Sequence, residues 1–168
     1  MQPESLQALL DRQQITELIY RYCRAVDRLD VPLGHSIWHE DATADYGAAV
    51  YQGPGRGVID LVCAQHRHAL NHSHQVTNVL IEVDGDRAAS ESYLIATLRL
   101  QRDDKLQQIM VWTRYVDRWS RRQGRWGLDH RIALRDFDEI REVRALSQDE
   151  RSRRDRQDPS YAVLAGLR

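Results

Sequence analysis

An acid and a histidine, far apart in the sequence, are the residues whose types could do chemistry together. The acid, Asp27, lies at the edge of an apolar stripe with helical spacing, directly after Val26 and one turn beyond Cys23. Part of its carboxylate would then face low-polarity surroundings, where a cation or a hydrogen-bond donor must compensate the charge. A simpler interpretation is a surface acid beside Arg24 or Arg28.

The histidine begins a strand predicted over residues 74–83, which ends at the turn 84–86. Strict alternation places on one face His74, Val76, Asn78 and Leu80, and on the other Gln75, Thr77, Val79, Ile81 and Val83. The first face combines an imidazole, an amide and two apolar groups. It is therefore the candidate wall of a small-molecule pocket.

Four histidines crowd this region: His66, His68, His72 and His74. Two of them, His68 and His72, have the i, i+4 spacing of metal ligands on one helix face. Neither a metalloprotease-like glutamate nor a second cysteine beside Cys63 accompanies them. The pattern favours a solvated helix end, and no metal site is predicted.

The last predicted strand, 126–137, carries an unusual set of charges. Alternation places Leu128, His130, Ile132 and Leu134 on one face, and Asp129, Arg131, Ala133 and Arg135 on the other. The charged face of an antiparallel sheet ordinarily points to water. On that interpretation neither arginine has a role in chemistry.

The elements that position these residues follow from periodicity and turn residues. Helices are predicted over 8–29, 31–39 and 58–70, with a strand pair over 41–52 and a glycine turn, 53–57, that lacks any nucleotide-binding spacing. Long strands are predicted over 74–83, 87–100, 107–121 and 126–137, with links short enough for antiparallel hairpins. The charged stretch 138–157 is predicted to be helical, and an apolar end, 158–168, follows it.

Composition limits the class of protein. A chain of 168 residues with 42% hydrophobic content suits one domain with a core, and its 24 basic and 25 acidic residues, without an RNA-binding or helix-turn-helix signature, argue against nucleic-acid binding. The arginine run 151–156 is interpreted as a solvated tail. No leader or membrane-length segment is found, so a cytoplasmic, non-membrane protein is expected. Its two cysteines, Cys23 and Cys63, occupy apolar helix positions and are expected to be free thiols.

Several short segments, taken in order, carry a resemblance to a known family. They are Arg21 to Asp27, Trp38 to Ala42, Asp45-Tyr46, Gly53-Pro54, His74 with Thr77-Asn78, Val83 to Asp86 and Gly124 to Trp126. Their order and spacing resemble the SnoaL-like branch of the nuclear-transport-factor-2-like superfamily, from about Ile15 to Phe137. The resemblance implies an α+β fold: a cone-shaped α+β barrel with a strongly curved, mixed but mostly antiparallel sheet, covered by three N-terminal helices.

Within that branch the chain resembles hexachlorocyclohexane dehydrochlorinase, bile-acid 7α-dehydratase and scytalone dehydratase, which are cofactor-free lyases. The resemblance implies an Asp27-His74 catalytic dyad, an active-site arginine at Arg131, and further functional positions at Tyr22, Tyr46 and Arg135. The chain differs from these enzymes at two functional positions. Tyr22 stands where the dehydrochlorinase has a lysine, and Ala96 stands where the bile-acid enzyme has an aspartate. Its substrate therefore need not be the same as theirs.

The resemblance also reverses the interpretation of the charged strand face, because the concave face of such a cone lines a ligand cavity. The substrate-binding candidates are Tyr46, Asn78, Leu94, Ala96, Leu98, Val111, Thr113, Tyr115 and Arg135. A mostly apolar pocket with a few polar groups suits a hydrophobic cyclic molecule. For the apolar members, ordinary core packing is the alternative.

The resulting hypothesis is a cofactor-independent lyase. Asp27 would orient His74, His74 would take a proton, and Arg131, or failing it Arg135, would stabilise the departing group, with Tyr22 and Tyr46 as donors. The alternatives are a polyketide cyclase or ketosteroid-isomerase-like isomerase, and a non-catalytic binding or assembly subunit.

The chain divides into a domain, 1–138, and an extension, 139–168, whose end is too apolar for a freely solvated terminus. The resemblance implies a homotrimer, with a homodimer as the alternative, and a tail packed at a subunit interface or over the pocket mouth. A tail folded back on its own chain, or frayed, is the competing expectation.

Overall fold

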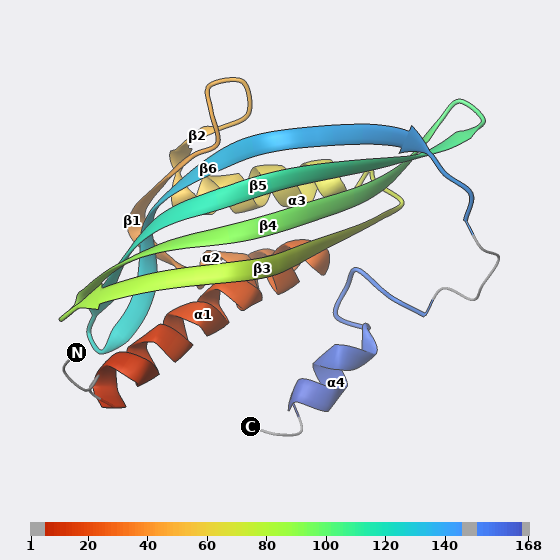
Figure 1. Cartoon of the computed structure of the whole chain (residues 1–168). Helices are drawn as coiled ribbons and strands as arrows, with labels where there is room; N and C mark the ends of the chain where they lie inside the picture. The colour runs from red at the N-terminus through yellow and green to blue at the C-terminus, as the bar shows by residue number, and fades with distance from the viewer. Residues whose placement is uncertain (1–5, 146–150, 166–168) are drawn as a thin grey trace.

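One curved sheet, with three helices on its concave side, makes up most of the protein (Figure 1). The computed structural model describes residues 6–145 and 151–165. Along the chain the elements are α1 (Leu6–Asp27), α2 (Val31–His35), β1 (Trp38–Asp45), β2 (Gln52–Pro54), α3 (Gly55–His66), β3 (Asn71–Asp84), β4 (Arg87–Arg102), β5 (Lys105–Arg122), β6 (Arg125–Glu142) and α4 (Pro159–Ala165). The predicted α+β class and the three covering helices are confirmed.

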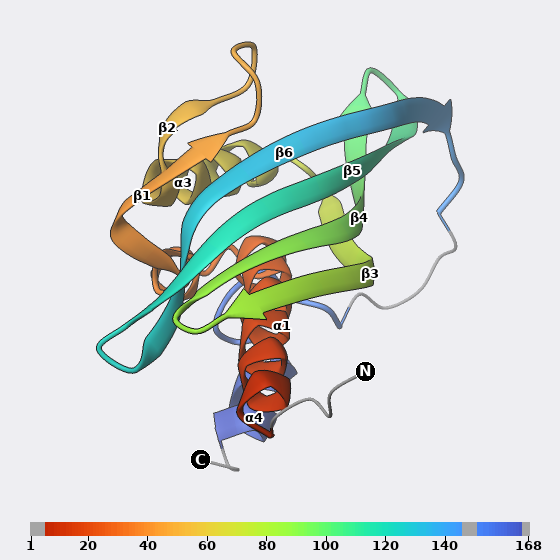
Figure 2. The ribbon, with the colours of Figure 1, turned by 60° about the vertical axis from the view of Figure 1, so that its left-hand side comes forward.

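The sheet is mixed and mostly antiparallel. Its strand order is β2-β1-β6-β5-β4-β3, and β1 with β6 is the parallel pair. The four long strands follow one another through two-residue turns, as expected from the short links. At Gln123 and Gly124 both turn residues have positive φ, 53° and 77°, which matches the twist of the flanking strands. Figure 2 shows how this twist bends the unclosed sheet around the helices.

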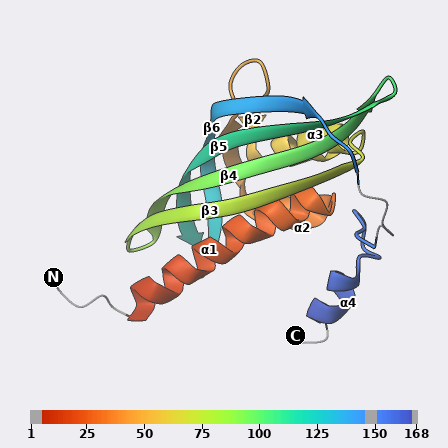
Figure 3. The same cartoon turned by 45° about the vertical axis from the view of Figure 1, so that its right-hand side comes forward.

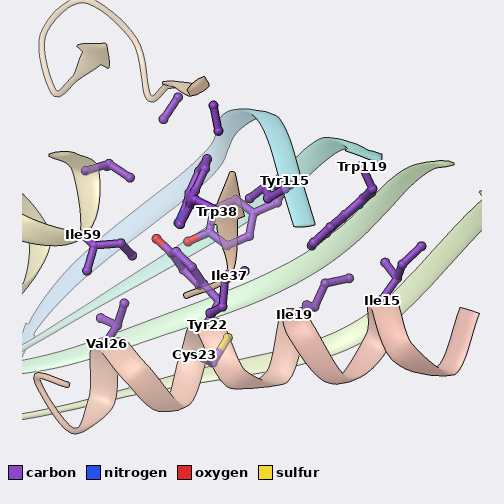
Figure 4. Packing of buried hydrophobic residues seen from close by; sticks show 14 of the residues in the cluster. Ile15, Ile19, Tyr22, Cys23, Val26, Ile37, Trp38, Ile59, Tyr115 and Trp119 are labelled. Carbon is purple, nitrogen blue, oxygen red and sulfur yellow. The ribbon is translucent and has the colours of Figure 1, made fainter. Parts of the chain in front are cut away.

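The long first helix lies along β3 and turns its apolar stripe toward the sheet (Figure 3). Ile15, Ile19 and Val26 are almost completely buried, and Figure 4 shows them pointing toward the same interior as Tyr115 and Trp119. The helical periodicity of the sequence therefore predicted the correct face of α1. Because Asp27 is its last residue, the packing of this stripe also fixes where the carboxylate lies.

A tryptophan fills the space between α3 and the sheet. Trp38, the first residue of β1, is completely buried. A Cβ atom at Gly55, the first residue of α3, would lie 2.1 Å from the Trp38 ring, so only glycine fits there. The predicted glycine turn is thus partly the start of a helix, and its sequence serves close packing rather than ligand binding.

Two bulges overturn the strict alternation assumed for the strands. On β3 the register shifts between Val76 and Val79, so that Ile81 faces the core while Asn78 and Leu80 are exposed. The prediction that Asn78 shares the face of His74 is therefore wrong. A bulge inserts an extra residue, which moves every later side chain to the opposite face.

On β6 the extra residue is Asp129, because Trp119 pairs with Leu128 and Arg118 with His130. As a result Leu128 and Arg131, which alternation placed on opposite faces, are both completely buried. The bulge thus brings the arginine to the concave side without expelling the leucine from the core.

The prediction of a helix over 138–157 is wrong for the residues that the structure describes. β6 continues to Glu142, because β5 is long enough to pair with it as far as Gln107. Residues 151–158 form turns that lead into α4, and 146–150 lie outside the described residues. None of the described helices is long and apolar enough to cross a membrane.

The C-terminal segment, 151–165, folds back on its own chain, one of the two competing expectations for the tail. Its Tyr161 hydroxyl donates to Asp30 Oδ2 at 2.7 Å, and Arg156 Nη2 donates to Asp30 Oδ1 at 3.1 Å. In the other direction, Arg24 Nη1 donates to Ser160 Oγ at 3.0 Å. A frayed terminus is therefore wrong for these residues.

Candidate active site

The end of α1 and the start of β3 bring Asp27 and His74 into direct contact. His74 Nδ1 lies 2.7 Å from Asp27 Oδ1, and the backbone N–H of His74 donates to Asp27 Oδ2 at 3.1 Å. Only 5% of the His74 side chain and 16% of the Asp27 side chain are exposed. Because a carboxylate only accepts, the Nδ1 proton of a neutral His74 points to Asp27 and its lone pair lies on Nε2.

Two further imidazoles pack around His74. The ring of His66, the last residue of α3, is stacked on it at 5.4 Å between centroids, and the ring of His72 lies 4.7 Å from that of His66. Burial, with the nearby charges of His74, His72 and Arg154, lowers the pKa of His66 to about 3. A neutral His66 therefore covers one face of His74 at physiological pH.

The Asp27-His74 pair borders a hollow between α1 and β3 of about 290 Å³. It is lined by Tyr20, Cys23, Arg24, Asp27, Arg28, His74 and Val76. A larger hollow, of about 790 Å³, lies around the β3-β4 turn and Trp119 and includes no member of the pair. Proximity to the titratable groups makes the smaller hollow the relevant one.

Arg131 lies deeper, with none of its side chain exposed, and forms a two-pronged contact with Asp117. Its Nε donates to Oδ1 at 2.8 Å and its Nη2 to Oδ2 at 2.7 Å. Burial alone would lower the pKa of Arg131, but the charge of Asp117 outweighs it and holds the pKa well above its ordinary value. Nη1, also buried, has no hydrogen-bond partner among the residues that the structure describes.

Two tyrosine rings enclose the guanidinium. Its carbon lies 3.9 Å from the ring centroid of Tyr115 and 4.3 Å from that of Tyr22, distances of cation–π contacts. The Tyr22 hydroxyl is 2.8 Å from that of Tyr46. Burial raises the pKa of Tyr22 and of Tyr115 well above the ordinary value, so both phenols are neutral. The structure thus brings three predicted site residues, Tyr22, Tyr46 and Tyr115, together around the charge of a fourth, Arg131.

Strand register places most of the apolar candidates on the face of His74. His74 pairs with Ala96 and Ala96 with Val111, while Leu94 pairs with Thr113. Cross-strand partners share a face. Leu94 and Tyr115 belong to the core, whereas four members of the set are only half-buried: Ala96, Leu98, Val111 and Thr113.

Two sequence candidates are exposed. Asn78 faces outward at the β3 bulge. Arg135 pairs with Thr113 and so shares the face of His74, but its side chain is 70% exposed and contacts Asp138 at 3.1 Å. An arginine in water with its own carboxylate partner is a poor stabiliser of developing charge. Neither residue is retained as a site residue.

The sequence missed three side chains that support the site, namely Asp117, His66 and His72. If the β5-β6 pairing continued without a break from the 123–124 turn, Asp117 would pair with His130. The bulge at Asp129 shifts this register, so that Asp117 lies opposite Arg131. The cluster of four histidines is visible in the sequence, but its spacing suggests only a metal site or a solvated helix end. α3 ends at His66, so His68 and His72 do not share a helix, and no group of three potential metal ligands is found among the described residues.

A protein-family model described as "SnoaL-like domain" matches residues 7–132. The chain belongs to this SnoaL-like family, within the nuclear-transport-factor-2-like superfamily. A search of the curated proteins gives no match.

Solved structures share the fold of this SnoaL-like chain at low identity. A hexachlorocyclohexane dehydrochlorinase, LinA-type3 from Novosphingobium barchaimii, is 22% identical with a TM-score of 0.71, covering 88% of this chain and 99% of that one. Kfla4162 from Kribbella flavida is 21% identical, with a TM-score of 0.71 and 79% and 95% covered. A variant of Rv3472 from Mycobacterium tuberculosis, described as of unknown function, is 24% identical, with a TM-score of 0.65 and 76% and 77% covered.

The two cysteines of the SnoaL-like chain are free and buried, as predicted. Burial raises the pKa of Cys23 to about 12 and that of Cys63 to about 11, so both are protonated thiols. Cys23 lies beside the hollow but cannot serve as a nucleophile in this form, because the thiolate is the reactive species.

Removing the carboxylate of Asp117 should strongly destabilise the protein. Asp117→Ala leaves the charge of Arg131 buried without a counter-ion, and we expect a loss of about 3–5 kcal/mol in the free energy of unfolding in urea. Glu142→Ala is the matched control, because Lys105–Glu142 also joins β5 to β6 but has side chains 63% and 61% exposed. It should change stability by at most ~0.5 kcal/mol. Equal losses in the two variants would contradict the assignment.

Acid should destabilise the protein through His66. An unfolded His66 takes up a proton as pH falls below about 6.5, whereas the folded state resists protonation until the pKa of about 3. The free energy of unfolding therefore decreases as pH falls through this window, by up to about 1.4 kcal/mol per pH unit for this group. His66→Gln should show a shallower slope between pH 6 and 4 than His35→Gln, whose ring is half-exposed. Identical slopes would be the contrary result.

Proposed function

We propose that this protein is a cofactor-independent lyase of the dehydratase or dehydrohalogenase type, which removes a proton from a hydrophobic cyclic small molecule. The observation that carries the proposal is the buried contact between Asp27 and His74 at 2.7 Å. A carboxylate on Nδ1 holds the ring in the tautomer whose lone pair is on Nε2, and it stabilises the imidazolium that forms when the ring takes a proton.

In this mechanism His74 Nε2 removes a proton from a carbon of the substrate. The C–H electron pair becomes the new double bond, and the leaving group departs from the neighbouring carbon with its own bonding pair. A halide leaves as the anion, while a hydroxyl leaves as water after it accepts the proton that His74 gained. Asp27 keeps its charge throughout and holds the ring.

The departing group needs a positive partner, and Arg131 is the candidate. Two of its nitrogens are committed to Asp117, but the N–H bonds of Nη1 remain available. In dry surroundings a fixed N–H aimed at developing charge acts more strongly than in water.

The surroundings favour an apolar substrate. The half-buried row beside His74, which consists of Ala96, Leu98, Val111 and Thr113, offers little hydrogen bonding apart from one hydroxyl. Leu94 and Tyr115 continue the row into the core. A flat or cyclic hydrocarbon skeleton would gain by covering these side chains. The dehydrochlorinase LinA-type3, which shares the fold, is named for a substrate of this kind.

A second candidate function, an isomerase or cyclase, is favoured by the Tyr22-Tyr46 pair. Two phenol groups in hydrogen-bond contact beside a buried guanidinium could hold an enolate oxygen instead of assisting departure. The same base would then return its proton elsewhere on the substrate. The product would have the mass of the substrate, whereas a lyase product lacks water or hydrogen halide.

The lyase proposal is tested with a panel of halogenated cyclohexanes and cyclic 3-hydroxyketones, with loss of halide or water followed by mass spectrometry. We expect His74→Ala to abolish elimination and Asp27→Asn to lower kcat by roughly 10²-fold, because the ring loses orientation and charge stabilisation. His68→Ala, an exposed histidine nearby, is the control and should keep full turnover. Full turnover by His74→Ala would refute the base assignment, and isobaric products would favour the isomerase.

We also propose a homotrimer, with a homodimer as the alternative. The outer sheet face, defined by Tyr93, Val116, Ile132, Leu134 and Phe137, leaves large apolar side chains in water, with Phe137 59% exposed. Burying Phe137 between subunits would stabilise an assembly. We expect light scattering to give an oligomeric mass that Phe137→Glu lowers, while Leu164→Glu on α4 leaves it unchanged. A monomeric mass for the unaltered chain would refute the proposal.

A further inference from the structure

The C-terminal segment reaches the histidines of the candidate site through one arginine. Arg154 Nη1 donates to the backbone carbonyl of His66 at 2.8 Å and lies 3.3 Å from His72 Nδ1. The arginine is half-buried, unlike Arg151 and Arg153 in the same segment, which are exposed. It therefore ties the end of α3 and the start of β3 to residues far along the chain.

His72 connects this arginine to the last turn of α1. Its Nε2 lies 3.0 Å from the backbone carbonyl of Val26. A carbonyl only accepts, so the proton of His72 is on Nε2, and Nδ1 is left to accept from Arg154. Burial lowers the pKa of His72, which keeps the ring in this neutral form.

The bonded carbonyl belongs to the residue directly before Asp27, and Asp27 ends the helix. The last carbonyls of the helix already accept from backbone N–H groups: that of Arg24 from Arg28, that of Ala25 from Asp30, and that of Val26 from Leu29 at 3.1 Å. His72 adds a second donor to the Val26 carbonyl and joins the end of α1 to β3. A chain of contacts thus runs from Arg154 through His72 and Val26 to Asp27, and across the 2.7 Å contact to His74. His66, whose backbone carbonyl accepts from the same arginine, lies against the ring of His74.

Other contacts hold the segment in place. Asp30 accepts from Arg156 and Tyr161, and Arg28 lies 3.5 Å from Asp158. Both partners, Arg28 and Asp30, lie directly after Asp27, in the turn that follows α1. The segment is therefore fixed on the same part of the helix whose end Arg154 supports.

We propose that Arg154 and His72 are positioning residues for the Asp27-His74 pair, so that the C-terminal segment is part of the site. The relevance to catalysis rests on the proposed proton abstraction by His74, but the structural claim does not. The Val26 carbonyl and Arg154 together select the tautomer of His72. His72 holds the last turn of α1 against β3, and that turn sets the carboxylate against His74 Nδ1.

Nuclear magnetic resonance of the ¹⁵N-labelled full-length protein tests the arrangement without a substrate. At pH 7 we expect neutral His72 with its proton on Nε2, and a downfield signal for the His74 proton shared with Asp27. Arg154→Ala should mix the two tautomers of His72 and broaden or remove the His74 signal. Arg153→Ala is the matched control, since its side chain contacts the exposed Asp155, and it should leave both signatures unchanged.

Conservative variants separate positioning from bulk stability. Gln can donate to the Val26 carbonyl and accept from Arg154, so His72→Gln should keep the His74 signal, whereas His72→Leu should lose it at a comparable melting temperature. A proton on Nδ1 of His72 in the unaltered protein would overturn the proposal, even if Arg154→Ala fails to fold. Equal spectra for Arg154→Ala and Arg153→Ala would overturn it too.

Turnover is measured separately. With a substrate found in the panel, Arg154→Ala should lower kcat on the order of 10-fold at unchanged KM, because displaced catalytic groups slow the chemical step more than binding. If His74→Ala proves fully active, the lyase proposal fails. The positioning proposal is then still decided by the spectra of His72 and His74. If the spectra are insensitive to Arg154, the positioning proposal fails even though the lyase is real.

Discussion

The buried ion pair between Arg131 and Asp117 is the constraint on which the rest of the structure depends. Removing two charges from water costs several kcal/mol each, and only good geometry offsets this. The offset requires the two-pronged contact across β5 and β6, which exists because a bulge at Asp129 moves Arg131 opposite Asp117. It also requires the faces of Tyr22 and Tyr115 on either side of the guanidinium.

Tyr22 belongs to α1, so the buried charge of Arg131 also fixes this helix against the sheet. Five residues later, about 7–8 Å along the axis, the same helix presents Asp27.

This arrangement divides the candidate site into two zones with different physics. Around Arg131 the surroundings are dry, the tyrosines are neutral and the charge is permanent. Around His74 a hollow lies between α1 and β3, and the ring is held against the carboxylate of Asp27. A proton acceptor works best where its proton can reach water after turnover, whereas a charge stabiliser works best where water is excluded. α1 spans both zones, because it carries Tyr22 at the guanidinium and Asp27 at the imidazole.

The sequence predicted the elements whose signals are local and missed those that depend on register between strands. The apolar stripe of α1 and the two-residue turns gave the helices and hairpins, and the family resemblance paired Asp27 with His74, which the structure brings into contact. Asn78 was placed on the wrong face because alternation assumes an unbroken ladder, whereas the β3 ladder shifts register between Val76 and Val79. Asp117 was overlooked for the same reason. The stretch 138–157 has the composition of a solvated helix, but β5 offers a strand partner as far as Glu142, and tertiary pairing overrides propensity.

Unpaired donors in the core give a last argument that the deep zone binds something polar. Arg131 Nη1, Ser92 Oγ and Trp38 Nε1 are buried and have no hydrogen-bond partner among the described residues. All three belong to residues around the same charge: the Trp38 ring centroid is 5.8 Å from the Arg131 guanidinium carbon, and Ser92 pairs with Tyr115, whose ring covers that guanidinium. Each such atom costs about 1–3 kcal/mol when left unsatisfied, and a core built only for stability would pair or replace them. Three unpaired donors suit an oxygen or halide that gains negative charge, which is what a departing group does in an elimination. Under the proposed lyase function, the stability lost at this point would be the counterpart of a site organised in advance for the transition state.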